Sequence, residues 1–485
     1  MRRFYTAAAK PSGPGRPAAR RRIRAVSRGL LVRQGDIVTA ERRWRGDIRC
    51  RDGSIVELGA RLEAGGDEIV AADGLLVVPG GVDPHVHLSL PVAGTVSSDD
   101  FESGTAAALA GGTTTIVDFV HPERGESLLD ALAARRAEAA PALVDYGLHM
   151  AVTWWGPETG SWMAACVAAG VPSFKLYLAY KETIGLDDVD LVAALATIAG
   201  LDALAVVHAE HGDAVEHLRR HFAAAGHTEP VYHARSRPAA LEGEATHRAA
   251  TLAGVLGARL YVVHVTCREA VEALERARTA GFDVHGETCP QYLLLDETVY
   301  DAPGFEAAAY VIAPPIRPLG HQERLWRALA EGTLEVVASD HCPFHLAGQK
   351  DLGRDDFRLI PGGAAGIEHR LALIHTHGVV AGRFDLHRFV DLVSTAPARR
   401  FGLHPRKGTI AVGSDADLVL WDEAATAVIS ATTHRHRCDR SIYEGFTVRG
   451  APAVVIAGGE IRFRDGDLRA ERGSGRFLHR RLSPS

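Results

Sequence analysis

Residues 75–88 read LLVVPGGVDPHVHL, an apolar run that passes through a Gly-Gly pair and ends in two histidines. Parallel strands that helices cover on both faces appear in a sequence as nearly continuous apolar runs of this kind. Further apolar runs follow at residues 113–120, 146–154, 173–180, 203–210, 259–266, 282–288 and 334–341. Their repetition predicts a sheet built from many parallel strands.

Most of these runs are followed by Ala- and Leu-rich stretches that are typical of helices, such as residues 130–140, 190–200 and 267–281. Alternating strands and helices predict an α/β fold, and eight such units can close a (β/α)₈ TIM-like barrel. A doubly wound open sheet is the alternative. A GxGxxG turn after the first strand would favour it, and the chain has none there.

A capped helix is predicted after the first barrel strand. Ser97 or Ser98 can cap its N-terminus, the acidic side chains of Asp99, Asp100 and Glu102 suit its first turn, and Gly111 ends it.

The two ends of the chain differ from its middle. Residues 29–80 and 401–466 consist of short alternating stretches separated by Gly-containing turns. We expect these segments to form one small β-sandwich domain beside a barrel that spans residues 81–400. Residues 467–485 are interpreted as a C-terminal tail.

Residues 1–28 contain no Asp or Glu and are rich in Arg, Pro, Gly and Ala. This composition is typical of a disordered tail or of an over-long assigned start. A targeting segment is the alternative, because transit peptides are also rich in Arg and poor in acids.

The composition excludes several classes of protein. The chain has 485 residues, 46% hydrophobic and 24% charged, as in an ordinary globular enzyme. A net charge of −6 without a basic stripe argues against nucleic-acid binding. No uncharged apolar run reaches the ~20 residues of a membrane span. Six cysteines without CxxC spacing predict reduced thiols in a cytoplasmic protein.

Polar residues occur where the predicted barrel strands end, and this is the end at which such barrels place their chemistry. Five strands carry a metal-binding or titratable side chain there: His85 and His87, Lys175, His208, His264 and Asp340. The pattern predicts one common site at this rim of the barrel.

The His85–His87 pair is informative because residues two apart on an extended chain point to the same face. Two imidazoles on one face can bind a borderline-soft cation such as Zn²⁺. The alternative is a pair of histidines satisfied by hydrogen bonds in the core. A single histidine at a strand end, such as His208 or His264, is more often structural.

Lys175 and Asp340 are charged residues in otherwise apolar strand segments. Asp340 would be unpaired unless a cation met it. Lys175 can extend its amine to solvent or pair with an acid. Alternatively, a desolvated neutral amine can react with carbon dioxide to form an anionic carbamate that bridges two metal ions. A binuclear metal site would satisfy the four histidines, the lysine and the aspartate together.

Several motifs resemble those of dihydropyrimidinases and hydantoinases, cyclic amidohydrolases of the amidohydrolase superfamily. The resemblance covers about residues 30–466, and its main segments are GGVDPHVHL, SFKLYLAYKE, VVHAEHGD, YVVHVTCREAVE, GETCPQYL, VASDHCPF and PRKGTIAVGSDADLVLWD. It implies hydrolysis of the cyclic amide bond of 5,6-dihydropyrimidines or 5-substituted hydantoins, by a metal-bridging hydroxide, to N-carbamoyl amino acids. It also implies a homotetramer that acts on a small molecule.

The same resemblance implies a role for each residue of the site. One divalent ion, with Zn²⁺ as the expected metal, would be bound by His85, His87 and Asp340, and a second by His208 and His264. An N6-carboxylated Lys175 would bridge the two ions. Asp340 would transfer a proton to the leaving ring nitrogen, and Tyr180 would stabilise the oxyanion of the substrate carbonyl.

Four further positions are expected to contact the substrate: Leu90 and Val92 in the loop after the histidine pair, Ala313 before two prolines, and Gly362. At the last two positions the family typically has serine and asparagine. These two differences leave the preferred ring open, and the motifs specify neither the stereoselectivity nor the native metal.

Related families fit the motifs less well. Dihydroorotases have an arginine where this chain has Ser89, and allantoinases have a different loop after the histidines. Deaminases of the superfamily usually lack the lysine on the fourth strand. Hydantoinase-like scaffold proteins, the collapsin response mediator proteins, lack the metal ligands, and this chain has a suitable residue at every ligand position.

Overall fold

The computed structural model describes residues 29–483. The basic N-terminal segment, with both of its interpretations, lies outside the described residues.

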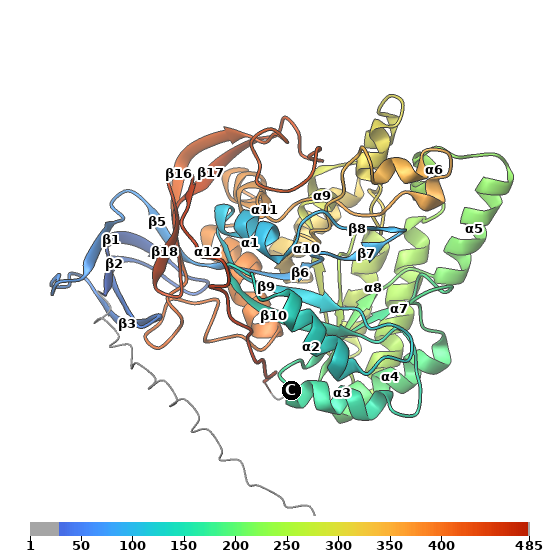
Figure 1. Ribbon diagram of the computed structural model, residues 1–485, viewed down its shortest axis with the longest axis horizontal. Helices are drawn as coiled ribbons and strands as arrows, with labels where there is room; N and C mark the ends of the chain where they lie inside the picture. The colour runs from blue at the N-terminus through green and yellow to red at the C-terminus, as the bar shows by residue number, and fades with distance from the viewer. Residues whose placement is uncertain (1–28, 484–485) are drawn as a thin grey trace, which may run out of the picture.

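A barrel of eight parallel strands forms the middle of the molecule, in the order β15-β14-β13-β12-β11-β10-β9-β6 (Figure 1). Its strands are β6 (Gly81–Val86), β9 (Thr113–Val120), β10 (Asp145–Ala151), β11 (Ser173–Tyr177), β12 (Leu204–His208), β13 (Arg259–Val262), β14 (Val284–Thr288) and β15 (Val336–Val337). A parallel bridge between Val86 and His341 brings the two edges together. The predicted (β/α)₈ barrel is confirmed.

Helices cover the outside of this barrel. Those between successive strands are α1 (Phe101–Ala110), α2 (Leu128–Glu138), α3 (Thr159–Ala168), α4 (Asp188–Gly200), α5 (Gly212–Ala224), α6 (Val231–Arg235), α7 (Ala239–Leu256), α8 (Arg268–Thr279), α9 (Pro290–Leu294) and α10 (His321–Glu331). Three short helices follow β15: α11 (Arg370–Ile374), α12 (Leu386–Val390) and α13 (Ala396–Arg400). In α8 the buried residues, including Ala270, Val271, Leu274 and Ala277, recur at helical spacing, which turns one apolar face to the strands.

A second, mostly antiparallel sheet of nine strands lies beside the barrel and draws on both ends of the chain (Figure 1). Its first part is β1 (Leu30–Val38), β2 (Arg43–Arg51), β3 (Ser54–Gly59), β4 (Glu68–Ala71) and β5 (Leu76–Pro79). The second part is β16 (Leu418–Val428), β17 (Thr447–Ala457), β18 (Glu460–Arg464) and β19 (Asp467–Leu468). The parts join where β5 pairs with β16, at Leu418 opposite Pro79.

The run at residues 75–88 divides between the two sheets. β5 belongs to the terminal sheet and β6 to the barrel, and Gly80 separates them. A Cβ atom at Gly80 would lie only 2.1 Å from Thr114 Oγ1. Glycine therefore permits the close approach that lets the chain pass from one sheet to the other.

The predicted serine cap of α1 is wrong. Asp100 is the N-cap, and its side chain accepts the Ser103 N–H while the Ser103 hydroxyl accepts the Asp100 N–H. The Ser97 hydroxyl instead donates to the His87 carbonyl and accepts the Leu90 N–H. Ser97 is thus committed to the loop after β6, whereas Gly111 ends the helix as predicted.

Residues 469–483 pack against the barrel. Tyr146 forms a bridge with Phe477, and the buried Arg480 guanidinium donates to the Leu148 carbonyl and to the Ser173 hydroxyl. Between residues 29 and 483, no helix combines the length and apolarity needed to cross a membrane. All six cysteines are buried free thiols.

Candidate functional site

The barrel brings the predicted polar residues to the same ends of its strands. His85 lies at the end of β6 and His87 just after it, Lys175 is on β11, and His208 ends β12. His264 and Asp340 follow β13 and β15 in the left-handed region, with φ of 39° and 51°. Such backbone costs about 1–3 kcal/mol for a residue other than glycine and is concentrated at functional sites.

His85, His87 and Asp340 form a tight buried group. Asp340 Oδ1 lies 3.2 Å from His85 Nε2 and 3.3 Å from His87 Nε2. The two Nε2 atoms are 3.1 Å apart. One ligand atom from each residue lies within 4.8 Å of the others, which makes this a candidate metal-binding group.

His208 and His264 form a second group beside the first. His208 Nδ1 lies 3.0 Å from His264 Nε2, and the rings of His264 and His85 have centroids 5.4 Å apart. Burial holds the pKa of both His264 and His85 well below its usual value, so each ring is neutral at neutral pH. Neutral imidazoles are the form that binds metal ions.

Lys175 lies within this cluster rather than on the surface. Its side chain is 1% exposed, and its Nζ lies 4.9 Å from the centre of the Phe119 ring. Burial lowers the pKa of Lys175 to about 8. A substantial neutral fraction of the amine is therefore available near neutral pH, as carbamate formation requires.

Two glutamate side chains contact the histidines on the side away from the cluster. His85 Nδ1 contacts Glu287 Oε1, and His208 Nε2 contacts Glu210 Oε2 at 2.7 Å. If each of these nitrogens donates its proton to the carboxylate, the opposite nitrogen turns a lone pair into the cluster. Arg237 in turn donates to Glu210 at 2.6 Å.

Sequence reasoning did not assign these two glutamates. A signal was present in each case, because Glu287 is a charged residue inside an apolar strand and Glu210 lies two positions after His208. Burial raises the pKa of Glu287 to about 8. Burial alone would also raise the pKa of Glu210, but Arg237 and His208 lower it overall.

Tyr180 lies next to the second histidine pair. Its ring centroid is 5.2 Å from that of His208, and its backbone is left-handed, with a φ of 58°. Burial raises the pKa of Tyr180 to about 12, which keeps the hydroxyl protonated and able to donate a hydrogen bond.

Ala313 and Gly362 lie on two segments that are hydrogen-bonded to each other, since the Gly363 N–H donates to the Val311 carbonyl at 3.0 Å. Ala313 is half-buried and precedes a cis proline. A Cβ atom at Gly362 would meet nothing within 4 Å. This position therefore opens onto free space.

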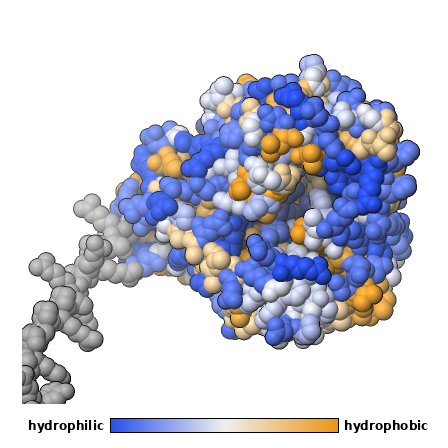
Figure 2. Space-filling model, turned by 45° about the vertical axis from the view of Figure 1, so that its right-hand side comes forward, coloured by the Kyte–Doolittle hydropathy of each residue, from blue (hydrophilic) through white to orange (hydrophobic). Residues whose placement is uncertain are grey.

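Leu90 and Val92 lie apart from the barrel sheet, at the start of a hairpin formed by β7 (Pro91–Val92) and β8 (Thr95–Val96). Both side chains are half-buried. When the β7–β8 side of the molecule faces the viewer, its surface is hollowed near the centre, with apolar patches beside the hollow (Figure 2).

Cavity size by itself does not identify the site. A cavity of about 1020 Å³ is lined by residues of the terminal sheet and of the opposite end of the barrel, among them Asp145, Asp417 and Arg476. The histidine cluster lies at the other end of the barrel strands, away from this cavity.

A parallel barrel with a buried group of imidazoles and carboxylate at its strand ends defines a class, the barrel hydrolases. Residues 76–462 match the profile of the Amidohydrolase family, and the chain belongs to this family.

Individual relatives and solved structures are similar to this chain over almost its whole length. The D-hydantoinase of Geobacillus stearothermophilus is 45% identical over 452 residues, which are 93% of this chain and 96% of that protein. The dihydropyrimidinase of Rattus norvegicus is 41% identical over 93% of this chain and 88% of its own. The crystal structure of dihydropyrimidinase from Brevibacillus agri superposes with a TM-score of 0.92, at 43% identity over 93% of this chain and 98% of that one.

Proposed function

We propose that this protein opens the ring of 5,6-dihydropyrimidines or 5-substituted hydantoins by hydrolysis of a cyclic amide bond. The product would be an N-carbamoyl amino acid. The relatives named D-hydantoinase and dihydropyrimidinase, matched over almost their full lengths, support this activity. The observation that carries it is the cluster of four imidazoles, one lysine and one carboxylate at the strand ends, in which all but the partly exposed Asp340 are buried.

The cluster is suited to two divalent ions, with Zn²⁺ as the expected metal. Its ring nitrogens converge in two pairs, His85 Nε2 with His87 Nε2 at 3.1 Å and His208 Nδ1 with His264 Nε2 at 3.0 Å. His85, His87 and Asp340 would hold one ion, and His208 and His264 the other. When bound, the ions would supply Lewis acidity and lower the pKa of a bound water toward neutrality.

Lys175 would complete the ligand set as an N6-carboxylated side chain. Its neutral amine adds to carbon dioxide and releases one proton, which leaves an anionic carbamate between the two histidine groups. The Lys175→Ala variant should lose this ligand, with most of the activity and at least part of the bound metal. Full activity with a normal metal content in that variant would contradict the assignment.

Asp340 and Tyr180 would act directly on the substrate. Burial alone would raise the pKa of Asp340, but the imidazoles of His85 and His87 help to lower it overall, so the carboxylate is ionised. It can accept a proton from the attacking water and deliver it to the ring nitrogen as the C–N bond breaks. The Tyr180 hydroxyl would donate a hydrogen bond to the carbonyl oxygen as that atom gains negative charge.

Leu90, Val92, Ala313 and Gly362 would contact the part of the substrate that does not react. Gly362 leaves open space that any side chain would partly fill. We therefore assign to this region the choice between an unsubstituted ring and a bulky 5-substituent.

We also propose a cytoplasmic homotetramer. The six buried free cysteines agree with a reducing compartment. Light scattering on the purified protein should give four times the mass of the chain, and a monomer would contradict the assembly without affecting the chemistry.

The deciding experiment is ring opening by the zinc-loaded protein. Dihydrouracil and both enantiomers of a 5-substituted hydantoin are the test substrates, and allantoin and dihydroorotate are the matched controls. We expect hydrolysis of dihydrouracil or of a hydantoin, and little of the controls. Metal-loaded protein that is inactive on both test rings would overturn the proposed substrate class, and protein that binds no stoichiometric metal would favour a scaffold.

A further inference from the structure

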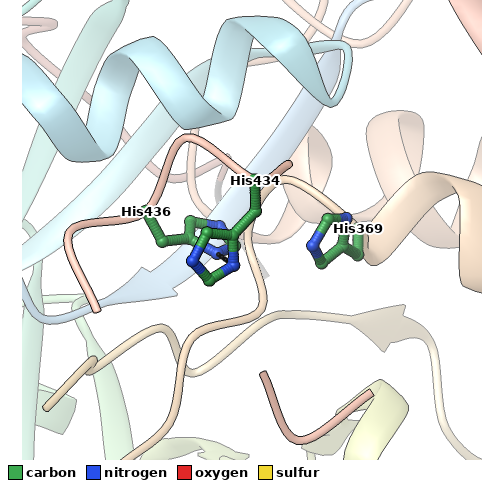
Figure 3. Close-up of side chains that lie close together, drawn as sticks. All are labelled: His369, His434 and His436. Carbon is green, nitrogen blue, oxygen red and sulfur yellow. Dashed lines mark hydrogen bonds between the residues drawn. The ribbon is translucent and has the colours of Figure 1, made fainter. Parts of the chain in front are cut away.

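A second cluster of histidines lies outside the site described above. His369 is the N-cap residue of α11. His434 and His436 come from the loop between β16 and β17, about 65 residues further along the chain. The three side chains meet beside α1, as Figure 3 shows. One ring nitrogen from each lies within 4.8 Å of the others.

The loop places two of these imidazoles in direct contact. His434 Nδ1 and His436 Nδ1 are 3.3 Å apart, and the His436 ring centroid lies 5.3 Å from that of His369. His434 and His436 are two residues apart, the same spacing as His85 and His87.

Hydrogen bonds already orient two of the rings. His434 Nε2 donates to the Cys438 carbonyl at 3.0 Å, so its Nδ1 presents a lone pair to the cluster. His436 Nε2 accepts the Glu368 N–H at 3.2 Å and lies 3.9 Å from the Glu368 carboxylate. An ion bound at His436 Nδ1 would move the ring proton to Nε2, where the Glu368 carboxylate 3.9 Å away would be an acceptor.

His369 has an unused nitrogen. Its Nε2 is buried and has no hydrogen-bond partner. A buried ring nitrogen without a partner, next to two further imidazoles, is a costly arrangement that a bound cation would relieve.

We propose that His369, His434 and His436 bind a third divalent ion of the zinc class, separate from the pair at His85 and His208. Three imidazoles are an established ligand set for Zn²⁺, with a fourth position left for water. The ion would tie the loop at residues 430–440 to the start of α11.

The position of this ion gives it a structural connection to the candidate catalytic end of the barrel. The His436 ring lies 5.0 Å from that of His341, the residue after Asp340. Asp99 accepts hydrogen bonds from both His341 and the Arg437 N–H. Fixing the loop would therefore also fix the residues behind Asp340.

Metal counting on the whole protein tests the proposal. Zinc-loaded wild-type protein should carry one more equivalent of zinc per chain than the His369→Ala variant. The control is His247→Ala, which removes an exposed imidazole from α7 and should retain the wild-type count. His369→Ala is preferred to a change at the more deeply buried His436 because it removes the unpartnered ring. A second variant, His434→Gln, should show the same loss.

Anomalous diffraction at the zinc edge locates each ion independently of activity. We expect a peak about 2.0–2.1 Å from one nitrogen of each of the three rings. Equal zinc counts in wild type and His369→Ala, or a peak at His85 and His87 with none at His369, would overturn this third site while leaving the proposed hydrolase intact. A peak at His369 with none at His85 would support the third site and contradict the metal site of the proposed hydrolase.

Discussion

The tautomer of a histidine at a strand end depends on the group that its second ring nitrogen contacts. At His85 and His208 that group is a buried glutamate, Glu287 or Glu210. The hydrogen bond to this glutamate selects the tautomer and thereby decides which nitrogen faces the cluster with a lone pair. At His149, by contrast, the two nitrogens contact Ser173 Oγ and the Pro84 carbonyl, so that ring is a satisfied core residue.

Glu210→Gln should weaken metal binding. The amide can no longer accept a charge-assisted hydrogen bond from His208, and it leaves Arg237 without an anionic partner. Loss of such a partner typically lowers metal affinity about 10–100-fold, which competition with a chelator can measure. Glu335→Gln, at the opposite end of the barrel, is the control, and an equal loss there would argue for a general effect on folding.

Tyr180→Phe should lower turnover and leave substrate binding nearly unchanged. The hydroxyl would act on charge that develops only in the transition state, and removal of one such donor costs about 10²–10³-fold in kcat. Steady-state kinetics on the best ring substrate check this. Tyr146→Phe removes a hydroxyl near the other end of the barrel and should behave as wild type. An unchanged kcat for Tyr180→Phe would end its assignment as an oxyanion donor.

At the scale of elements, short loops hold the rim of the barrel in place. α1 begins immediately after the β7–β8 hairpin, and its capping box with Asp100 fixes where the helix starts. The neighbouring Asp99 contacts His341, which follows Asp340. The start of α1 is thus linked, through Asp99 and His341, to Asp340, a candidate metal ligand that follows the last barrel strand.

Asp100→Ala should destabilise the protein by about 1 kcal/mol, because the first turn of α1 loses its cap. Asp100→Asn keeps an oxygen acceptor and should retain most of the stability. Thermal unfolding of the three proteins measures the difference. Arg437→Ala removes the exposed ion pair between Arg437 and Asp100 and leaves the cap in place. If this variant loses as much stability as Asp100→Ala, the effect belongs to the ion pair and not to the cap.

At the scale of the whole molecule, buried charge connects the two sheets. Lys407 Nζ lies 2.8 Å from Asp145 of β10 and 2.6 Å from Asp417, just before β16. Burial alone would raise the pKa of Asp145, but Lys407 and Arg476 lower it to about 2. The carboxylate therefore stabilises the folded state only while it is ionised.

The stability of the wild type should fall in acid as Asp145 is protonated. Since its folded pKa lies below the unfolded value of about 3.9, its contribution of about 2 kcal/mol is present above about pH 5 and is lost as the pH falls toward 2. Asp145→Asn should have a flatter stability profile between pH 5 and 2, measured by denaturant unfolding. Asp202→Asn, an exposed change, should keep the wild-type slope, and parallel profiles for all three proteins would exclude this role.

The barrel, its strand order and the positions of its polar residues could be predicted from the sequence. An apolar run and the direction of the chain are local properties, and together they place His85, Lys175, His208 and Asp340 at one rim. The placement of strands β9 and β11 at residues 113–120 and 173–177 follows the predicted runs closely.

Other features depend on contacts between residues far apart in the chain, and local patterns do not encode such contacts. His85 meets Glu287 across 202 positions, and His369 meets His434 and His436 only because α11 packs near the loop after β16. The serine cap failed for a more local reason, since the Ser97 hydroxyl is hydrogen-bonded within the loop after β6. Periodicity thus specifies which face a side chain occupies, but only the closed barrel and its attached sheet bring distant donors together and determine which groups share a proton or a metal.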